Sequence, residues 1–247
     1  MPDLSEPLPP RPALKRIGHK GADLISPGNT LESFDAALAA GVDMVEFDVL
    51  PEHADGSGRL VLAHDYTAAT RGSALTLEQG LAHFGQDAWA GVELNVDMKT
   101  TGYERRVVDA LRSHGLADRA LISTMEEQSL AVVREAAPEI RLGWSVPKVR
   151  RNPLSSRWTR IPALVLARYA QRVLPGRAAS AIADGRIDAI MCHWILVTPR
   201  LVRAIGAAGG ELYVWTVDDA QRIAALERLG VTGIITNDPR LFGTAPA

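Results

Sequence analysis

The sequence predicts an α/β protein folded as a (β/α)8 barrel, or TIM barrel, because short strand-like runs alternate with longer helical patterns along the chain. Eight such strand–helix units fit into about 230 residues, the size usual for this barrel. The 247 residues are 47% hydrophobic, which is enough for one large core. The same alternation also permits an open, doubly wound sheet, which is the alternative architecture.

The spacing of apolar residues places the elements in order along the chain. A proline-rich leader over 1–13 is expected to be extended and flexible, and 14–247 to form one domain. Strands are expected at 15–19, 44–49, 92–98, 120–123, 141–145, 189–192, 211–216 and 233–236. Helices are expected near 30–40, 76–84, 103–114, 126–136, 157–174, 198–208, 218–229 and 238–242.

Two helix starts have the spacing of a capping box, Asn29 with Glu32 and Ser123 with Glu126. One connection, 146–175, is too long for a simple crossover and contains Pro147, Pro153 and Pro162. We therefore expect part of it to be an inserted loop or lid.

Composition excludes several classes of protein. A single cysteine, Cys192, rules out a disulfide framework and a multi-cysteine metal cluster. A pI near 6.3 argues against a basic nucleic-acid binder. Neither a membrane-spanning apolar run of about 20 residues nor a secretory signal is recognisable, so we expect a soluble, cytoplasmic protein.

Carboxylates gather on two of the predicted strands, on the face set by the two-residue period. Glu46 and Asp48 share one face of the second strand, and Asp97 and Lys99 share one face of the third. Like charges in an interior repel unless a cation lies between them. Carboxylate oxygens favour a hard divalent ion such as Mg²⁺ or Ca²⁺, whereas an ion-paired strand end is the alternative.

Two histidines end apolar runs near these carboxylates. His19 ends the first strand and is followed by Lys20, and His64 ends the run that begins at Val61. A single histidine is more often structural. Two histidines beside three carboxylates and two lysines indicate general acid–base chemistry around a metal-bound phosphate.

Several motifs follow one another in the order typical of a known family. They are His-Lys-Gly (19–21), Pro-Gly-Asn-Thr-Leu-Glu-Ser-Phe (27–34), Gly-Val-Asp-Met-Val-Glu-Phe-Asp-Val (41–49), His-Asp (64–65), Asn-Val-Asp-Met-Lys (95–99), Trp-Thr-Val-Asp (215–218) and Gly-Val-Thr-Gly-Ile-Ile-Thr-Asn-Asp-Pro (230–239). Together they resemble the glycerophosphodiester phosphodiesterase family, which consists of metal-dependent TIM-barrel enzymes. The resemblance covers roughly residues 15–242.

The resemblance implies a role for each matching residue. It implies hydrolysis of a glycerophosphodiester to an alcohol and glycerol 3-phosphate, with a Mg²⁺ or Ca²⁺ cofactor. His19 and His64 would be the acid–base pair, and Glu46, Asp48 and Asp97 would hold the metal. Lys20 and Lys99 would neutralise phosphate oxygens, and Trp215 would pack against the alcohol.

The sequence also departs from the family pattern. Lys20 stands where the family usually has Arg, Gly28 where it usually has Glu, and Asp97 where it usually has Glu. The family's small insertion is nearly absent, since only 66–75 follow His64-Asp65 before the next helix. A more open site would suit a bulkier diester. The alternatives are therefore a phospholipase D-type enzyme that forms a cyclic phosphate from lysophospholipids, and a barrel that binds a phosphorylated ligand without catalysis.

Charge is distributed unevenly along the chain. Residues 140–183 carry nine basic side chains and no acidic one, so the rest of a chain with net charge −2 carries −11. Leu166, Tyr169 and Val173 share a helix face here, with Arg168 and Arg172 on another. One interpretation is a solvated helix packed on the barrel. The other is that 148–177 attracts anionic diesters or contacts an anionic membrane.

Overall fold

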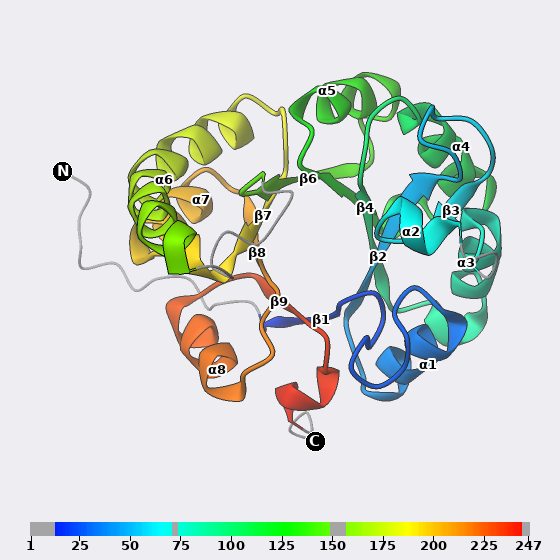
Figure 1. Cartoon of the computed structure of the whole chain (residues 1–247), viewed down its shortest axis with the longest axis horizontal. Coiled ribbons are helices and arrows are strands. Elements are labelled where there is room, and N and C mark those ends of the chain that lie inside the picture. The colour runs from blue at the N-terminus through cyan, green and yellow to red at the C-terminus, as the bar shows by residue number, and fades with distance from the viewer. Residues whose placement is uncertain (1–12, 71–73, 149–156, 244–247) are drawn as a thin grey trace.

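The computed structural model describes residues 13–70, 74–148 and 157–243, and the side chains of helix α6 from residue 166 onward. Eight parallel strands form a closed ring surrounded by helices (Figure 1). The ring closes because the first strand pairs with both the second and the last. The strands of the ring are β1 (Lys15–Gly18), β2 (Met44–Pro51), β4 (Glu93–Met98), β5 (Ala120–Thr124), β6 (Arg141–Val146), β7 (Ala189–His193), β8 (Glu211–Trp215) and β9 (Gly233–Thr236).

The fold is a single-domain TIM barrel, as predicted, and each of the eight predicted strands is present in it. Its helices are α1 (Leu31–Ala39), α2 (Tyr66–Ala69), α3 (Leu77–Phe84), α4 (Glu104–Ser113), α5 (Glu127–Ala136), α6 (Arg157–Ala183), α7 (Pro199–Ala207) and α8 (Ala220–Leu229), with short 3-10 turns η1 (Asp87–Trp89), η2 (Ala117–Arg119), η3 (Trp194–Leu196) and η4 (Pro239–Phe242).

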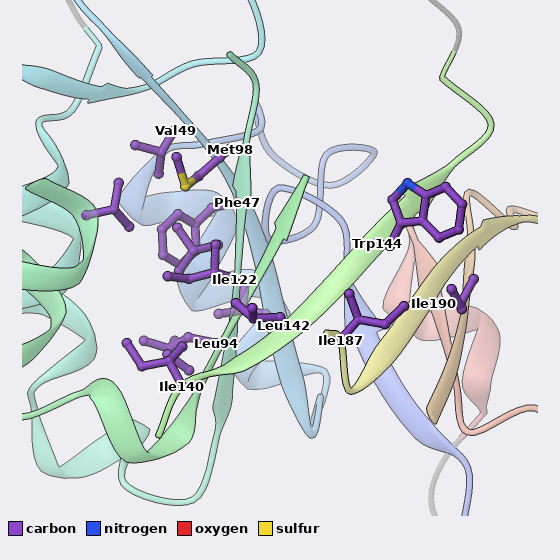
Figure 2. Close-up of a cluster of buried hydrophobic side chains, with 14 of the residues drawn as sticks. Phe47, Val49, Leu94, Met98, Ile122, Ile140, Leu142, Trp144, Ile187 and Ile190 are labelled. Carbon is purple, nitrogen blue, oxygen red and sulfur yellow. The ribbon is translucent and has the colours of Figure 1, made fainter. Parts of the chain in front are cut away.

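The two-residue period of the strands divides the core into two parts. Outward-facing residues such as Phe47, Leu94 and Ile122 pack between the ring and its helices (Figure 2). A smaller cluster, which includes Met44 and Tyr213, fills the ring itself. Residues with the parity of Met44 on β2 therefore point into the barrel.

Two local expectations, both about helix caps, were wrong. Thr30 caps α1 in place of Asn29, and Glu126 precedes α5 without a capping side chain, so Ser123 is no cap. The apolar run before His64 forms β3 (Leu60–Leu62), a short strand antiparallel to β2. Neither Asn29 nor Ser123 caps a helix, because Asn29 donates to Asp48 and Ser123 donates to Asp97.

The predicted insertion at 146–175 lies mostly within α6, which extends to Ala183. The predicted leader, 1–13, falls almost entirely outside the described residues, as does the start of the insertion, 149–156. In the described part of the chain, no helix combines the length and apolar character needed to cross a bilayer.

Candidate active site

Three carboxylates from two neighbouring strands meet inside the barrel, near the C-terminal ends of the strands. In the β2–β4 register Glu46 lies opposite Asn95, and Asp48 lies opposite Asp97. All of these residues share the inward parity of Met44. One oxygen each of Glu46, Asp48 and Asp97 can be chosen so that all three lie within 4.8 Å of one another. The sequence prediction that these side chains converge agrees with this arrangement.

The ammonium group of Lys99 is the nearest positive charge to this cluster. Lys99 Nζ lies 2.5 Å from Asp48 Oδ1 and also contacts Asp97 Oδ2. Burial alone would lower the pKa of Lys99, but the charges of Asp48, Asp97 and Glu46 outweigh burial and hold it well above its usual value. Lys99 is therefore a cation that balances only part of the cluster's negative charge.

Glu46 and Asp48 respond to this shared environment in opposite directions. Burial raises the pKa of Glu46 well above its usual value, and the charge of Asp48 raises it further. Burial would also raise the pKa of Asp48, but the charges of Lys99, His19 and His64 outweigh burial and lower it. Without a further cation, burial and the charge of Asp48 therefore favour a proton on Glu46 over one on Asp48.

These residues fit a divalent cation of the Mg²⁺ or Ca²⁺ type. Three converging carboxylates are the hard oxygen donors that such ions prefer. The buried Oδ1 of Asn95, on the same inward face, has no hydrogen-bond partner among the described residues. A second cation would compensate the charge that Lys99 leaves unbalanced.

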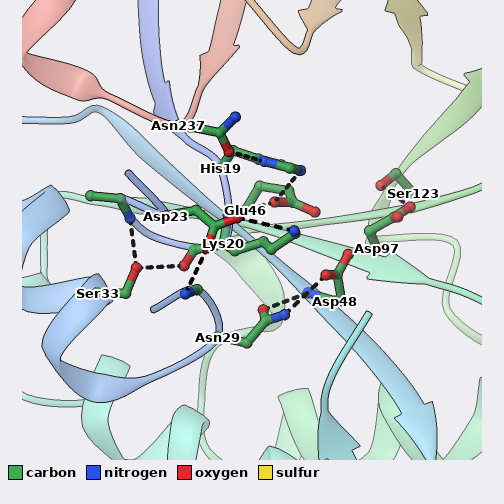
Figure 3. Close-up of polar contacts among 12 residues, drawn as sticks. His19, Lys20, Asp23, Asn29, Ser33, Glu46, Asp48, Asp97, Ser123 and Asn237 are labelled. Carbon is green, nitrogen blue, oxygen red and sulfur yellow. Dashed lines mark hydrogen bonds and ion pairs between the residues drawn. The ribbon is translucent and has the colours of Figure 1, made fainter. Parts of the chain in front are cut away.

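His19 lies beside the cluster, at the end of β1 (Figure 3). Its Nε2 is 3.8 Å from Glu46 Oε2, and its Nδ1 is 2.5 Å from Asn237 Oδ1. Burial lowers the pKa of His19 below its usual value. The ring is thus held on one side and faces the carboxylates on the other.

The remaining predicted residues surround this centre less closely. His64 follows β3 with its side chain 58% exposed, and its Nδ1 lies 3.7 Å from Asp65 Oδ2. The charge of His64 is one of the causes that lower the pKa of Asp48. Trp215 ends β8 and meets the ring of His193 edge to face at 5.1 Å.

Lys20 contacts the site through its backbone as well as its side chain. Its backbone N–H donates to Glu46 Oε2 at 2.8 Å, and its φ of +50° lies in the left-handed region. Its ammonium group donates to Asp23 Oδ2 at 3.1 Å. Asp23 also accepts from the Gly28 N–H, and its carboxylate lies 2.6 Å from where a Cβ at Gly28 would be. Asp23 therefore supplies the first loop with a carboxylate that residue 28 lacks.

Sequence reasoning missed several polar residues that complete the site. Asn29 donates to Asp48 Oδ2 at 2.9 Å and accepts from the Asp48 backbone N–H, and Ser123 donates to Asp97 Oδ1 at 3.0 Å. Asn237 holds His19. Two of them share a signal, a position at the C-terminal end of a strand, because Ser123 is the last but one residue of β5 and Asn237 follows β9.

The fold and this cluster define a TIM barrel with an acidic centre that could hold a cation. The model of the glycerophosphoryl diester phosphodiesterase family matches residues 19–79 and 76–241, so the chain belongs to this family of phosphoric diester hydrolases.

Named relatives cover nearly the same length of chain. A glycerophosphodiester phosphodiesterase of Caldanaerobacter subterraneus is 26% identical over 90% of this chain and 93% of its own. A crystal structure of a putative glycerophosphoryl diester phosphodiesterase from Silicibacter pomeroyi has a TM-score of 0.72 at 20% identity, over 94% of this chain and 92% of that one. An Oleispira antarctica phosphodiesterase, solved in complex with the product sn-glycerol-3-phosphate, has a TM-score of 0.68 at 20% identity over 93% and 94%.

Proposed function

We propose that this protein hydrolyses glycerophosphodiesters to an alcohol and glycerol 3-phosphate. The observation that carries the proposal is the cluster of Glu46, Asp48 and Asp97 beside His19 in a barrel of this family. The Caldanaerobacter relative is named for this activity, and the Oleispira structure contains sn-glycerol-3-phosphate. Both support a glycerophosphate group as the part of the substrate that the site recognises.

The proposed cofactor is Mg²⁺ or Ca²⁺, held by Glu46, Asp48 and Asp97. When bound, such an ion stabilises negative charge on a phosphate oxygen. The lysines Lys20 and Lys99 add positive charge for the remaining oxygens, which is the main requirement of phosphodiester cleavage.

The proposed acid–base pair is His19 and His64. One histidine removes the proton of the attacking hydroxyl, and the other protonates the departing alkoxide. Their different surroundings, one ring held by Asn237 and the other half in solvent, support different roles. Trp215 is proposed as the apolar wall for the alcohol moiety.

A substrate panel tests the activity. Glycerophosphocholine and a lysophospholipid are incubated with EDTA, Mg²⁺ or Ca²⁺, and products are followed by ³¹P NMR. We expect cation-dependent release of glycerol 3-phosphate, with His19→Ala inactive and the exposed His53→Ala unaffected as the matched histidine control. Activity that survives both EDTA and His19→Ala contradicts the proposal. If a cyclic phosphate accumulates instead, the protein catalyses the phospholipase D-type reaction and not hydrolysis. If no diester is cleaved but the product binds tightly, the protein is a binding protein.

We also propose that 148–177 brings the site to an anionic phospholipid bilayer. On α6, Leu166 and Tyr169 are 67% and 64% exposed, and Val173 is also exposed. Arg168 and Arg172 are exposed on the same part of the helix. Apolar side chains flanked by arginines, without an acidic residue from 140 to 183, are complementary to anionic headgroups.

The position of α6 supports this orientation. Gln171 Nε2 donates to the Ile195 carbonyl at 2.8 Å, in η3 directly after the C-terminal end of β7. Among the α6 side chains described from residue 166 onward, the first buried one is Leu174, so the exposed residues lie nearer the end of the helix that follows β6. In the loop after β1, Leu24 is also 62% exposed.

Vesicle sedimentation tests the bilayer contact. We expect binding to phosphatidylglycerol-containing vesicles that weakens with salt, and no binding to phosphatidylcholine alone. The double substitution Arg168→Gln/Arg172→Gln should weaken binding, whereas Arg200→Gln/Arg203→Gln on α7, with the same charge change, should not. Binding that ignores lipid charge and salt contradicts the proposal, while hydrolysis of soluble glycerophosphocholine tests the activity separately. The cytoplasmic location stays a prediction.

A further inference from the structure

A chain of hydrogen bonds runs from the loop after β8 to the catalytic face of β1. The Asp218 carboxylate accepts three hydrogen bonds from the end of β9 and the residue that follows it. Thr236 Oγ1 and the Asn237 backbone N–H donate to Asp218 Oδ1 at 3.0 and 2.8 Å, and Asn237 Nδ2 donates to Asp218 Oδ2 at 2.7 Å. Asn237 Oδ1 then lies 2.5 Å from His19 Nδ1 (Figure 3).

The chemistry of these groups fixes the direction of each bond. An ionised carboxylate only accepts hydrogen bonds, so the amide nitrogen of Asn237 must face Asp218. The amide oxygen of Asn237 must therefore face His19. An amide oxygen also only accepts, so Nδ1 of His19 must carry a proton.

The proton on Nδ1 decides which nitrogen can react. In the neutral ring, Nε2 then carries the lone pair, and Nε2 is the nitrogen that faces the carboxylate cluster, 3.8 Å from Glu46 Oε2. We propose that Asp218 is a positioning residue that fixes the tautomer of His19 through Asn237, and so presents Nε2 to the substrate. The effect on catalysis rests on the proposed function. The tautomer itself does not, because it is a property of the protein without substrate.

The proposal predicts a specific effect of Asp218→Asn. The new amide nitrogen cannot take the place of Oδ1, where Thr236 Oγ1 and the Asn237 N–H both donate. In the place of Oδ2 it meets only the Asn237 amide, which can rotate and offer its oxygen instead. The rotated Asn237 then presents its NH₂ group to His19 Nδ1, and the proton moves to Nε2.

A second substitution should restore the original arrangement. In the double variant Asp218→Asn/Asn237→Asp, a carboxylate faces His19 and the new amide at position 218 donates to it. Asn237→Asp alone instead places two carboxylates next to each other, where they repel. This single variant should therefore not restore the tautomer as the double variant does. Restoration by the pair requires these side chains to act as one unit.

Ring ¹⁵N NMR of the Mg²⁺-loaded protein, above the usual histidine pKa, measures the tautomer directly. The His19 signals are identified by their loss in His19→Gln. We expect a protonated Nδ1 in the natural protein, a protonated Nε2 in Asp218→Asn, and a protonated Nδ1 again in the double variant. Asp219→Asn is the matched control, because it changes the charge of the neighbouring residue while asparagine still caps α8.

Kinetics on a glycerophosphodiester give the second readout. We expect kcat of Asp218→Asn to fall by about 10²-fold with KM little changed, because a misdirected proton acceptor affects the reaction more than binding. The double variant should recover most of that loss. An unchanged tautomer in Asp218→Asn, or a double variant no better than Asp218→Asn, overturns the proposal. A natural protein that shows the expected tautomers but does not cleave diesters supports the positioning role and contradicts the proposed function.

Discussion

The two ends of the barrel interior each contain a cluster of charges, and the two clusters are balanced differently. At the N-terminal end, Lys15 and Arg141 alternate with Glu93 and Glu211. Lys15 Nζ lies 2.6 Å from Glu93 Oε1, Arg141 Nη1 lies 3.1 Å from Glu211 Oε2, and Arg141 also contacts Glu93. Two positive charges therefore meet two negative charges.

At the C-terminal end, three carboxylates share one buried ammonium, that of Lys99. The pKa values reflect this difference. Burial would raise the pKa of Glu93, but Lys15 and Arg141 outweigh burial and lower it, whereas the pKa of Glu46 is well above its usual value. The barrel thus favours the ionised form of Glu93 at its N-terminal end and disfavours the ionised form of Glu46 at its C-terminal end. A balanced cluster contributes to stability, and an unbalanced one is available for a ligand.

The largest expected difference between the two ends is in catalysis. Asp48→Asn should lower kcat/KM by about 10²–10³-fold, because it removes a central charge of the cation site. Glu93→Gln, an equal change of charge at the other end, should leave kcat/KM unchanged. The two variants are compared by their initial rates of glycerophosphocholine cleavage at saturating Mg²⁺. Equal losses in both variants contradict the division of roles.

Removal of the cation should affect only the C-terminal end. EDTA should abolish activity and leave the fold intact, because the core and the Glu93 cluster do not depend on the ion. Affinity for Mg²⁺ should rise with pH, since the ion must displace the proton that burial and Asp48 keep on Glu46. Isothermal titration calorimetry at two pH values measures the affinity for Mg²⁺. An affinity that falls as the pH rises contradicts a protonated Glu46 in the cation-free site.

The fold and the centre of this site could be predicted because both depend on short-range periodicity. Strand parity alone put Glu46 and Asp48 on one face, and that face is the inside of the ring. The ends of two apolar runs indicated His19 and His64, and the family resemblance implied the same pair. Asp97 lies four residues after Glu93 on the same inward face, so position along the strand separates it from Glu93, which is ion-paired with Lys15 at the other end.

The outer partners could not be predicted because the chain folds them onto the site from a distance. Asn29 resembles a helix cap, and only the loop after β1 brings its amide to Asp48. Asn237 precedes a short 3-10 turn, and local spacing gives no sign of His19, 218 residues away. The contact of Lys99 with Asp48 and Asp97 is likewise a property of the assembled interior.

Stability should respond to the two ends with opposite signs. Glu93→Gln should lower the free energy of unfolding by about 1–2 kcal/mol, because it removes one of the two carboxylates that balance part-buried Lys15 and Arg141. Asp97→Asn should leave it unchanged or raise it in cation-free protein, since it relieves repulsion among carboxylates. Urea unfolding in EDTA measures the free energy of unfolding of both variants. A larger loss of stability in Asp97→Asn than in Glu93→Gln contradicts the prediction.

The smallest expected effect is a dependence on acid. Because the folded pKa of Glu93 is lowered, its contribution to stability is present above the usual glutamate pKa and is lost as pH falls below it. Glu93→Gln should therefore lose less stability than the natural protein between pH 5 and pH 3, by less than about 1 kcal/mol. Urea unfolding midpoints measured across this pH range give the change in stability with pH for each protein. A steeper loss of stability in acid for Glu93→Gln than for the natural protein contradicts this prediction.

The pairing of β1 with β9 has a consequence for the geometry of the site. His19 ends the first strand and its partner Asn237 follows the last, so they meet only across the seam that closes the ring. The carboxylates stand on β2 and β4 and need no such closure. The position of the His19 imidazole therefore depends on closure of the ring, whereas the acidic cluster depends on two neighbouring strands.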